Sequence, residues 1–169
     1  MWLPIKISLY SDLNFNKLNA EDTGLKLRDA AFEDAQLLFD WANDEEVRNN
    51  SINQGQIKWD NHVHWLKLKL SDLTAKIFIL ENNDNPVAQI RIDQEGAYWT
   101  IDYSVDKAYR GKGYGKIIVT RIIEKYPSYP FRAVVKKNNI ASRKVFENLG
   151  FKHCHSEDDN LYLYEYQHY

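Results

Sequence analysis

The sequence predicts one α/β domain with a mixed sheet and helices on its faces. Stretches with alternating apolar and polar residues are separated by short turn-rich segments, which is typical of strands. Other stretches carry apolar residues at helical spacing. The length of 169 residues fits a single hydrophobic core. The predicted order is a strand, two helices, three strands, a helix, a strand, a helix and two strands.

The first elements follow a polar N-terminal stretch. We expect residues 1–24 to be an extension or linker and residues 25–169 to form the single domain. The alternating "LKLRDA" predicts a strand. Apolar residues at helical spacing then predict one helix from about Glu33 to Arg48 and a second from about Trp59 to Leu70. The first of these lacks a good N-cap, because Ala31 stands where Ser or Thr would serve better.

The second half of the chain is predicted to complete the sheet. "AKIFILE", "VAQIRID" and "AYWTIDYSV" are predicted strands, and the short turns between them indicate antiparallel neighbours. A glycine-rich loop and a helix come next, and Pro127 ends that helix at about Tyr126. "FRAVV" is a predicted strand, and "IASRKVFENL" is a predicted helix with Gly150 at its C-terminal cap. "KHCHS" and "LYLYEY" are predicted to form a last hairpin.

The composition excludes several classes of protein. A formal net charge of −2 does not suggest a nucleic-acid binder, whose domain is usually strongly basic. The sequence has no apolar run as long as a membrane span, and "MWLPIKISLY" lacks a cleavage-like site. Cys154, the single cysteine, fits a reducing compartment, so we expect a cytoplasmic protein without nucleic-acid or membrane partners. The aromatic content of 14% suits a core or a pocket for a flat or sugar-like ligand.

The glycine-rich loop lies in "VDKAYRGKGYGKIIVTRII". Three of the seven glycines fall within five residues, between a predicted strand and a predicted helix. The first turn of a helix has free N–H groups and a partial positive charge, and glycines allow a phosphate to come close. The pattern fits neither the Walker loop nor the dinucleotide fingerprint. The sequence therefore predicts a different phosphate-binding loop, with a glycine-rich turn bearing solvated lysines as the alternative.

Two segments resemble motifs of one family. "V-x-x-x-x-R-G-x-G-Y-G" resembles the acetyl-CoA pyrophosphate loop of the GCN5-related N-acetyltransferase (GNAT) family. "NNIASRKVFENLGF" resembles the next motif of that family, and the order of elements matches over about Leu25 to Tyr166.

This resemblance implies the GNAT fold, a mostly antiparallel sheet that splays at the cofactor site. Acetyl-CoA would be the co-substrate, no metal would be needed, and an unprotonated amine would attack the thioester directly. The implied cofactor-binding residues are Tyr103, Ser104, Val105, Arg110, Gly111, Lys112, Gly113, Tyr114, Gly115, Lys116, Asn139, Ser142 and Phe146.

The catalytic residues are less well defined by the resemblance. Many members of the family carry a tyrosine acid at the position of Phe146, which has no proton to give. Ser142, one turn earlier, is a candidate for this role, and its alternative role is that of a small residue packed against CoA. His62 is a candidate base, although its helical spacing between Trp59 and Leu66 favours a core side chain. Asp102 and Glu95 are rival bases.

The segment from Leu38 to Asp72 bears on the acceptor. It resembles a GNAT subgroup that acts on amino groups of nucleotide-linked deoxy-aminosugars, as in pseudaminic acid synthesis. The resemblance places four residues on the acceptor side: Trp41, Arg48, His62 and Trp65. Arginine suits a diphosphate, and tryptophan suits a base or a sugar face.

Other acceptors and other functions stay open at this point. A protein N-terminus or a polyamine is the alternative acceptor, and a CoA-binding module without turnover is the alternative function. The expected partner is a small-molecule amine, and a homodimer is an open alternative to a monomer. His153 and His155 flank Cys154 on one strand, and we interpret this triplet as structural, because a metal site would need further ligands at compatible spacing.

Overall fold

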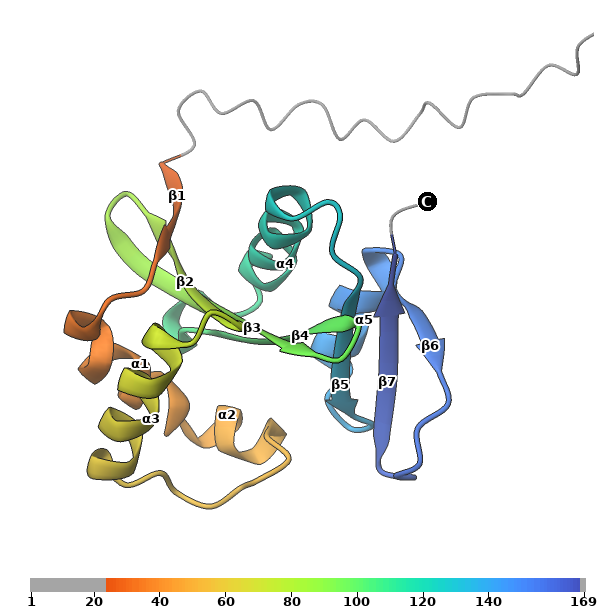
Figure 1. The fold of residues 1–169 in the computed structure, drawn as a ribbon, viewed down its shortest axis with the longest axis horizontal. Coiled ribbons are helices and arrows are strands. Elements are labelled where there is room, and N and C mark those ends of the chain that lie inside the picture. The colour runs from red at the N-terminus through yellow and green to blue at the C-terminus, as the bar shows by residue number, and fades with distance from the viewer. Residues whose placement is uncertain (1–23, 168–169) are drawn as a thin grey trace, which may run out of the picture.

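The computed structural model describes residues 24–167, which form one seven-stranded sheet with helices on both faces (Figure 1). The predicted extension lies outside the described residues, apart from Gly24. The strand order is β1-β2-β3-β4-β5-β7-β6. The strands are β1 (Leu25–Asp29), β2 (Ala75–Asn82), β3 (Asn85–Glu95), β4 (Tyr98–Val105), β5 (Phe131–Lys136), β6 (Lys152–Cys154) and β7 (Leu161–Tyr166).

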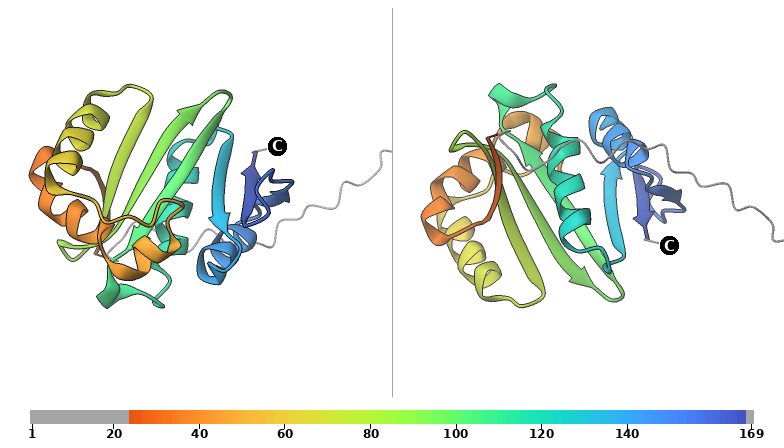
Figure 2. Two further views of the ribbon diagram at one scale, coloured as in Figure 1. Left: turned by 90° about the horizontal axis from the view of Figure 1, so that it is seen from below. Right: turned by 90° about the horizontal axis from the view of Figure 1, so that it is seen from above.

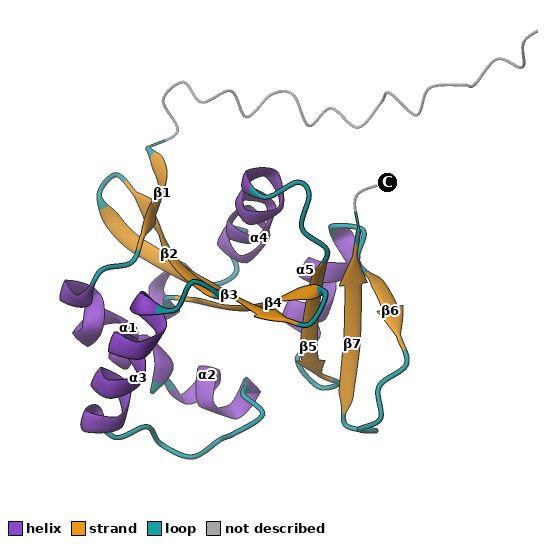
Figure 3. Cartoon of the chain, viewed as in Figure 1, coloured by secondary structure: helices purple, strands orange, loops and turns teal. Residues whose placement is uncertain are grey.

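The helices lie on opposite faces of this sheet. Figures 1 and 3 show α1, α2 and α3 on one side and α4 on the other, with α5 close to β5. The α-helices are α1 (Ala35–Ala42), α2 (Glu45–Asn50), α3 (Trp59–Ser71), α4 (Tyr114–Lys125) and α5 (Ile140–Asn148). Two short 3-10 helices are η1 (Phe32–Asp34) and η2 (Lys107–Tyr109). Within the described residues, no helix is long and apolar enough to cross a membrane.

One predicted element was wrong. The single helix expected from about Glu33 to Arg48 is broken into η1, α1 and α2. At Asp44 the backbone leaves the helical region, with φ −56° and ψ 136°, and the side chain accepts the N–H groups of Glu46 and Val47. Asp44 is therefore the N-cap of a new helix. The remaining predicted helices and strands are confirmed, with small shifts at their ends.

Strand β2 shows how the sequence pattern produces the two-sided core. Ile77 and Ile79 pack with Leu38 and Leu66 of α1 and α3, whereas Phe78 packs on the other face, in the cluster that contains α4. Successive side chains of a strand point to opposite faces, so a strand covered by helices on both sides is apolar throughout. Burying each such Leu or Ile side chain contributes about 1.5–3 kcal/mol.

The sheet opens between β4 and β5, the pair that runs parallel. Its register contains only two pairs: Trp99 with Phe131 and Thr100 with Arg132. Beyond this point β4 continues to Val105 paired with β3 alone, and β5 continues to Lys136 paired with β7 alone. Figure 2 shows the two strands diverging. The expected splayed, mostly antiparallel sheet is confirmed, and the opening leaves backbone groups of both strands available to a ligand.

Candidate active site

A cavity of about 1010 Å³ begins at this opening and extends beneath α2 and α3. Such a volume is at the upper end of the roughly 300–1,000 Å³ that is usual for ligand pockets. Its wall combines segments far apart in the sequence: α2 and the following loop, α3, β3, β4, the glycine loop and α5. One half faces the glycine loop, and the other half faces α2 and α3. We call these the loop half and the helix half.

The glycine loop forms an open cradle in the loop half. Gly111 and Gly113 have φ values of 73° and 88°, which glycine adopts without strain. Gly113 is the N-cap of α4, so the free N–H groups of the first helical turn lie next to the cavity. A Cβ added at either glycine would meet nothing within 4 Å. The cradle therefore has the open space and the donors that a diphosphate requires.

Two cations of the glycine loop, Arg110 and Lys112, are hydrogen-bonded within the protein. The Arg110 guanidinium donates to Asp44 Oδ1 at 2.5 Å, to Glu46 Oε2 at 2.9 Å and to the Val105 carbonyl at 3.1 Å. Lys112 Nζ donates to the Ala108 carbonyl at 2.9 Å. Both cations are thus engaged with the protein in this structure. Together with the helix N-terminus, the exposed Lys116 lining the cavity supplies positive charge for a phosphate.

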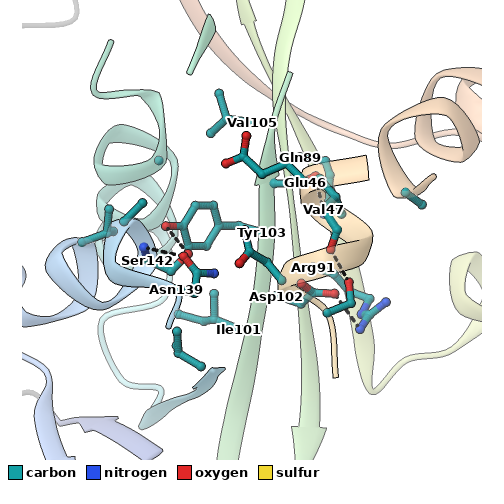
Figure 4. Close-up of a pocket in the computed structure, with 18 of the residues that line it drawn as sticks. Glu46, Val47, Gln89, Arg91, Ile101, Asp102, Tyr103, Val105, Asn139 and Ser142 are labelled. Atoms are coloured by element: carbon teal, nitrogen blue, oxygen red, sulfur yellow. Dashed lines mark hydrogen bonds and ion pairs between the residues drawn. The ribbon is translucent and has the colours of Figure 1, made fainter. Parts of the chain in front are cut away.

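Tyr103 crosses the opening from β4 towards α5. Its hydroxyl donates to Ser142 Oγ at 3.2 Å, as Figure 4 shows. A Cβ at Gly115 would lie 3.0 Å from Tyr103 Cε2, so the third glycine of the loop makes room for this ring. Burial raises the pKa of the Tyr103 hydroxyl, and the hydrogen bond with Ser142 offsets only part of that effect. Tyr103 is therefore a neutral hydroxyl at physiological pH.

The second motif supplies the start of α5. Asn139 caps the helix, because its Oδ1 accepts the Ser142 N–H at 3.1 Å. Phe146 is only 2% exposed and packs against the rings of Tyr103, Phe151 and Tyr164. Asn139, Ser142 and Phe146 all line the cavity. The motif thus positions one hydroxyl beside the opening, and the next turn of the helix presents an apolar ring.

The floor of the helix half is polar, and the sequence analysis did not identify two of its residues. Gln89 donates to Ser104 Oγ at 3.3 Å, and Arg91 pairs with Asp102 at 3.1 Å across the β3–β4 ladder. The Arg91 guanidinium also lies 5.2 Å from the centre of the Trp65 ring. The sequence signal was the set of polar residues that alternates with apolar ones along β3.

His62 is buried at the edge of the same half. Its Nε2 lies 3.0 Å from the Ala35 carbonyl oxygen, which can only accept, so Nε2 carries the proton and Nδ1 is the free acceptor. The ring packs among Phe39, Trp59 and Trp65. Burial lowers the pKa of His62, and the bond to Ala35 offsets this only in part. The side chain is therefore a neutral imidazole that lines the cavity.

Arg48 and Trp41, the other two residues discussed for the acceptor side, make hydrogen bonds within the protein. Arg48 lines the cavity, and its guanidinium donates to the carbonyls of Asn53 and Gly55 and to Ser51 Oγ. It therefore holds the loop after α2 in place. Trp41 is 7% exposed, donates to Asp106 Oδ2 at 2.7 Å and is not a cavity-lining residue. Trp41 therefore lies outside the lining of this cavity, and its indole N–H is bonded within the protein.

The charges that line the cavity are nearly balanced. They are Glu46, Glu95, Asp102, Arg48, Arg91, Arg110 and Lys116. Glu95 accepts a hydrogen bond from Thr100, whereas the Glu46 side chain is 61% exposed. Among residues 24–167, no group of three or more His, Cys, Asp or Glu side chains is arranged to hold a metal. His153 packs on Tyr162 and Tyr164 in the final hairpin.

Comparison with protein families identifies the family of this domain. The model of the family described as "Acetyltransferase (GNAT) domain" matches residues 25–152. The chain belongs to this family. It therefore carries an acetyl-CoA-dependent N-acetyltransferase domain, and the loop half of the cavity fits the cofactor that this activity requires.

Two individual relatives of this GNAT domain come from the same organism. An uncharacterized protein of Methanocaldococcus jannaschii is 26% identical over 164 residues, and the match covers 86% of this chain but only 31% of that protein. The chain thus spans about a third of that relative. A crystallised domain from the same organism is 25% identical, with a TM-score of 0.76, and the match covers 86% of this chain and 99% of the domain.

Two structures with bound CoA are more distant in sequence. A ribosomal L7/L12 α-N-protein acetyltransferase in complex with coenzyme A has a TM-score of 0.74 at 14% identity, with coverage of 86% and 95%. A Vibrio cholerae spermidine N-acetyltransferase in complex with CoA and spermine has a TM-score of 0.73 at 12% identity, with coverage of 85% and 94%. At these identities the likeness concerns the fold.

Proposed function

We propose that the protein transfers the acetyl group of acetyl-CoA to a primary amine of a nucleotide-linked amino-deoxysugar. The observation that carries this proposal is the continuity of the cavity. The loop half, which has the open space and the N–H donors that a phosphate requires, leads through the β4–β5 opening into a helix half with a polar floor and an aromatic wall. A donor and an acceptor bound in the two halves would meet at the opening.

On the cofactor side, the bound acetyl-CoA supplies a thioester carbonyl as the electrophile. The N–H groups of the glycine loop and Lys116 hold the diphosphate. The unpaired edge of β4 from Tyr103 to Val105 offers backbone groups to the pantetheine arm, because this part of β4 has lost β5 as a partner. An N–H group near Val105 stabilises the negative charge that develops on the carbonyl oxygen.

On the acceptor side, the amine must lose a proton to react. His62 is the base that we favour, because it is neutral and keeps Nδ1 as an acceptor. Asp102 and Glu95 are the rivals, but Asp102 is paired with Arg91 and Glu95 accepts a hydrogen bond from Thr100. Both carboxylates are therefore already engaged within the protein.

The mixed charges and the aromatic wall of the helix half support a nucleotide-sugar over a polyamine. The helix half is lined by Arg48 and Arg91 together with Glu46, Glu95 and Asp102, so it is not the purely acidic site that a polycation would require. The indole of Trp65, with Arg91 stacked on it, offers a flat surface for a base or a sugar face. Arg48 supports this chamber indirectly, because its guanidinium holds the loop after α2 in place.

The acceptor class is tested by release of CoA thiol with a panel of amines. The panel contains a UDP-linked 4-amino-4,6-dideoxyhexose, spermidine and a short peptide with a free N-terminus. We expect turnover with the nucleotide-sugar and little with the others. If spermidine or the peptide turns over and the sugar does not, the acceptor assignment fails. If none of the amines turns over while acetyl-CoA binds, the alternative of a CoA-binding module gains.

The acceptor wall is tested by matched tryptophan variants on α3. Trp65→Ala should raise the Michaelis constant for the sugar about tenfold, or about 1.4 kcal/mol, and leave acetyl-CoA affinity unchanged. Trp59→Ala is the control, because Trp59 is 41% exposed on the same helix and does not line the cavity. The assignment of Trp65 to the acceptor side would fail if the two substitutions had equal effects on the Michaelis constant for the sugar. It would also fail if Trp65→Ala alone weakened acetyl-CoA affinity.

A further inference from the structure

Helix α2 is tied to both strands of the opening, one at each of its ends. At its start, Asp44 and Glu46 accept hydrogen bonds from the Arg110 guanidinium. In its last turn, the Asn49 carbonyl accepts a hydrogen bond from Lys136 Nζ at 2.9 Å. Arg110 follows the end of β4, and Lys136 is the last residue of β5. The helix therefore connects the two strands beyond the point where they have ceased to pair.

The tie on the β4 side also holds the end of that strand. Besides its bonds to α2, Arg110 donates from Nε to the Val105 carbonyl at 3.1 Å. The guanidinium is planar and presents its donors in a fixed fork, so these bonds fix the Val105 peptide and α2 relative to each other. Val105 and Glu46 both line the cavity (Figure 4). Arg110 thus joins the strand edge offered to the cofactor to the helix that faces the acceptor.

The tie on the β5 side holds the other end of α2 together with the loop that follows. Lys136 is 87 positions from Asn49 and is not a cavity-lining residue. The Asn49 carbonyl also accepts a hydrogen bond from Gln54 Nε2 at 3.0 Å, and Arg48 donates to two carbonyls of the same loop. The position of this wall of the helix half therefore depends on a contact that lies outside the cavity.

We propose that Arg110 and Lys136 are positioning residues that hold α2 as a brace across the opening. The brace fixes the acceptor wall relative to the strands that receive acetyl-CoA. Neither side chain acts on the reacting atoms, but a displacement of about 1 Å between two reactants can cost roughly a hundredfold in rate. The inference rests on the two-half site of the proposed function and not on the identity of the acceptor amine.

The first test needs no acceptor and follows hydrogen exchange of the α2 amides with and without acetyl-CoA. Lys136→Met removes the donor to the Asn49 carbonyl and keeps a long side chain. Its α2 amides should exchange about fivefold faster than those of wild type, because a helix that has lost one anchor opens more often. Acetyl-CoA in the opening holds both strands, so it should slow exchange in α2 of wild type and do so less in Lys136→Met.

The matched control for the exchange experiment is Lys137→Met. Lys137 is the next residue in the chain, and its ammonium lies 5.4 Å from the centre of the Tyr162 ring in β7. Exchange in α2 of this variant should follow wild type in both conditions. Equal exchange in α2 of wild type and Lys136→Met, with and without acetyl-CoA, would overturn the brace.

The second test is kinetic and uses the amine of the panel that wild type turns over best. Lys136→Met should raise the Michaelis constant for that amine about fivefold, with a smaller effect on the constant for acetyl-CoA. Its urea midpoint should stay close to that of wild type, because a hydrogen bond at the surface adds little to global stability. Arg110→Lys keeps a positive charge at the loop but loses the planar fork, so it should raise the Michaelis constant for the amine as well. Lysine would replace Arg110 without this effect if the residue served only as a charge for the diphosphate.

The outcomes separate this inference from the proposed function. Both residues act through α2, so the effect of the double variant should differ from the product of the two single effects. An unchanged Michaelis constant for the amine in either single variant, or effects that multiply in the double variant, would overturn the brace. Turnover of spermidine or the peptide alone would overturn the acceptor assignment and not the brace. If no amine of the panel reacts, the exchange experiment decides the role of the two ties.

Discussion

Arg110, which opens the glycine loop, is hydrogen-bonded to Asp44, the N-cap of α2. The two residues are 66 positions apart, and Arg110 also binds Glu46 in the first turn of that helix. The same Asp44 carboxylate accepts the N–H groups of Glu46 and Val47. One carboxylate therefore caps α2 on the acceptor side and anchors the loop on the cofactor side.

The two roles of Asp44 can be separated by substitution. Asp44→Ala removes both the cap and the ion pair and should lower the free energy of unfolding by about 1–2 kcal/mol. Asp44→Asn keeps an oxygen for the cap and loses only the charge, so it should cost less than half of that. Urea unfolding at neutral pH measures both. Equal stability of wild type and Asp44→Ala would show that the cap contributes nothing.

Acid should weaken the fold through its paired carboxylates. Hydrogen bonds from Arg28 and Arg132 hold the pKa values of Asp34 and Glu165 below their ordinary range. Burial raises the pKa of Asp44, but the Arg110 hydrogen bond and the N–H groups of α2 outweigh this and lower it overall.

A lowered pKa in the folded state has a defined consequence for stability. The contribution is complete above the unfolded pKa values of about 3.9 for Asp and 4.3 for Glu, and it is lost as pH falls through the lower folded values. The urea midpoint should therefore drop steeply below about pH 4, and Asp34→Asn should show a smaller drop. An equal drop in wild type and Asp34→Asn would exclude the Asp34 contribution.

The sequence predicted most of the sheet because each strand carries its burial pattern locally. It also predicted the loop, because positive φ at a helix start restricts the residue type to glycine at Gly111 and Gly113. The break in the first helical region was missed because apolar spacing continues through Val47. The cue was Asp44 itself, a favourable N-cap residue within a run that otherwise reads as one helix.

Side-chain partners were less predictable than the backbone. Trp41 bonds to Asp106, which is 65 positions away, and no local pattern reveals that pair. Arg48 has the residue type that suits a phosphate, yet its guanidinium is occupied by the loop that ends α2. Residue type indicates which chemistry is feasible, whereas the tertiary fold decides which partner each side chain meets.

The cradle at the glycine loop makes a prediction for cofactor binding. Asn tolerates a positive φ better than most residues, so Gly113→Asn should fold while its side chain fills the space for the diphosphate. Acetyl-CoA at about 100 times its dissociation constant should stabilise wild type by roughly 2.7 kcal/mol. Most of this gain should disappear in Gly113→Asn.

The control for that experiment is Gly96→Asn. Gly96 has a φ of 62° in the turn between β3 and β4, and a Cβ there also meets nothing within 4 Å. It is not a cavity-lining residue. The control should lose a similar amount of intrinsic stability and keep the full gain from acetyl-CoA. If Gly113→Asn keeps the gain as well, the diphosphate does not lie in this cradle.

The buried His62 should make stability depend on pH in the neutral range. Burial lowers its pKa in the folded state, so below the unfolded value of about 6.5 the unfolded chain binds a proton that the folded chain resists. Stability should therefore fall as pH decreases from about 6.5 and level off below the folded pKa.

His62→Gln keeps an N–H donor for the Ala35 carbonyl and removes the titration, so its urea midpoint should fall less over this range. His64→Gln is the matched control, because His64 is exposed on the same helix, and its midpoint should follow wild type. Parallel curves of urea midpoint against pH for wild type and His62→Gln would show that His62 is not held neutral by burial. The assignment of His62 as the base would then fail.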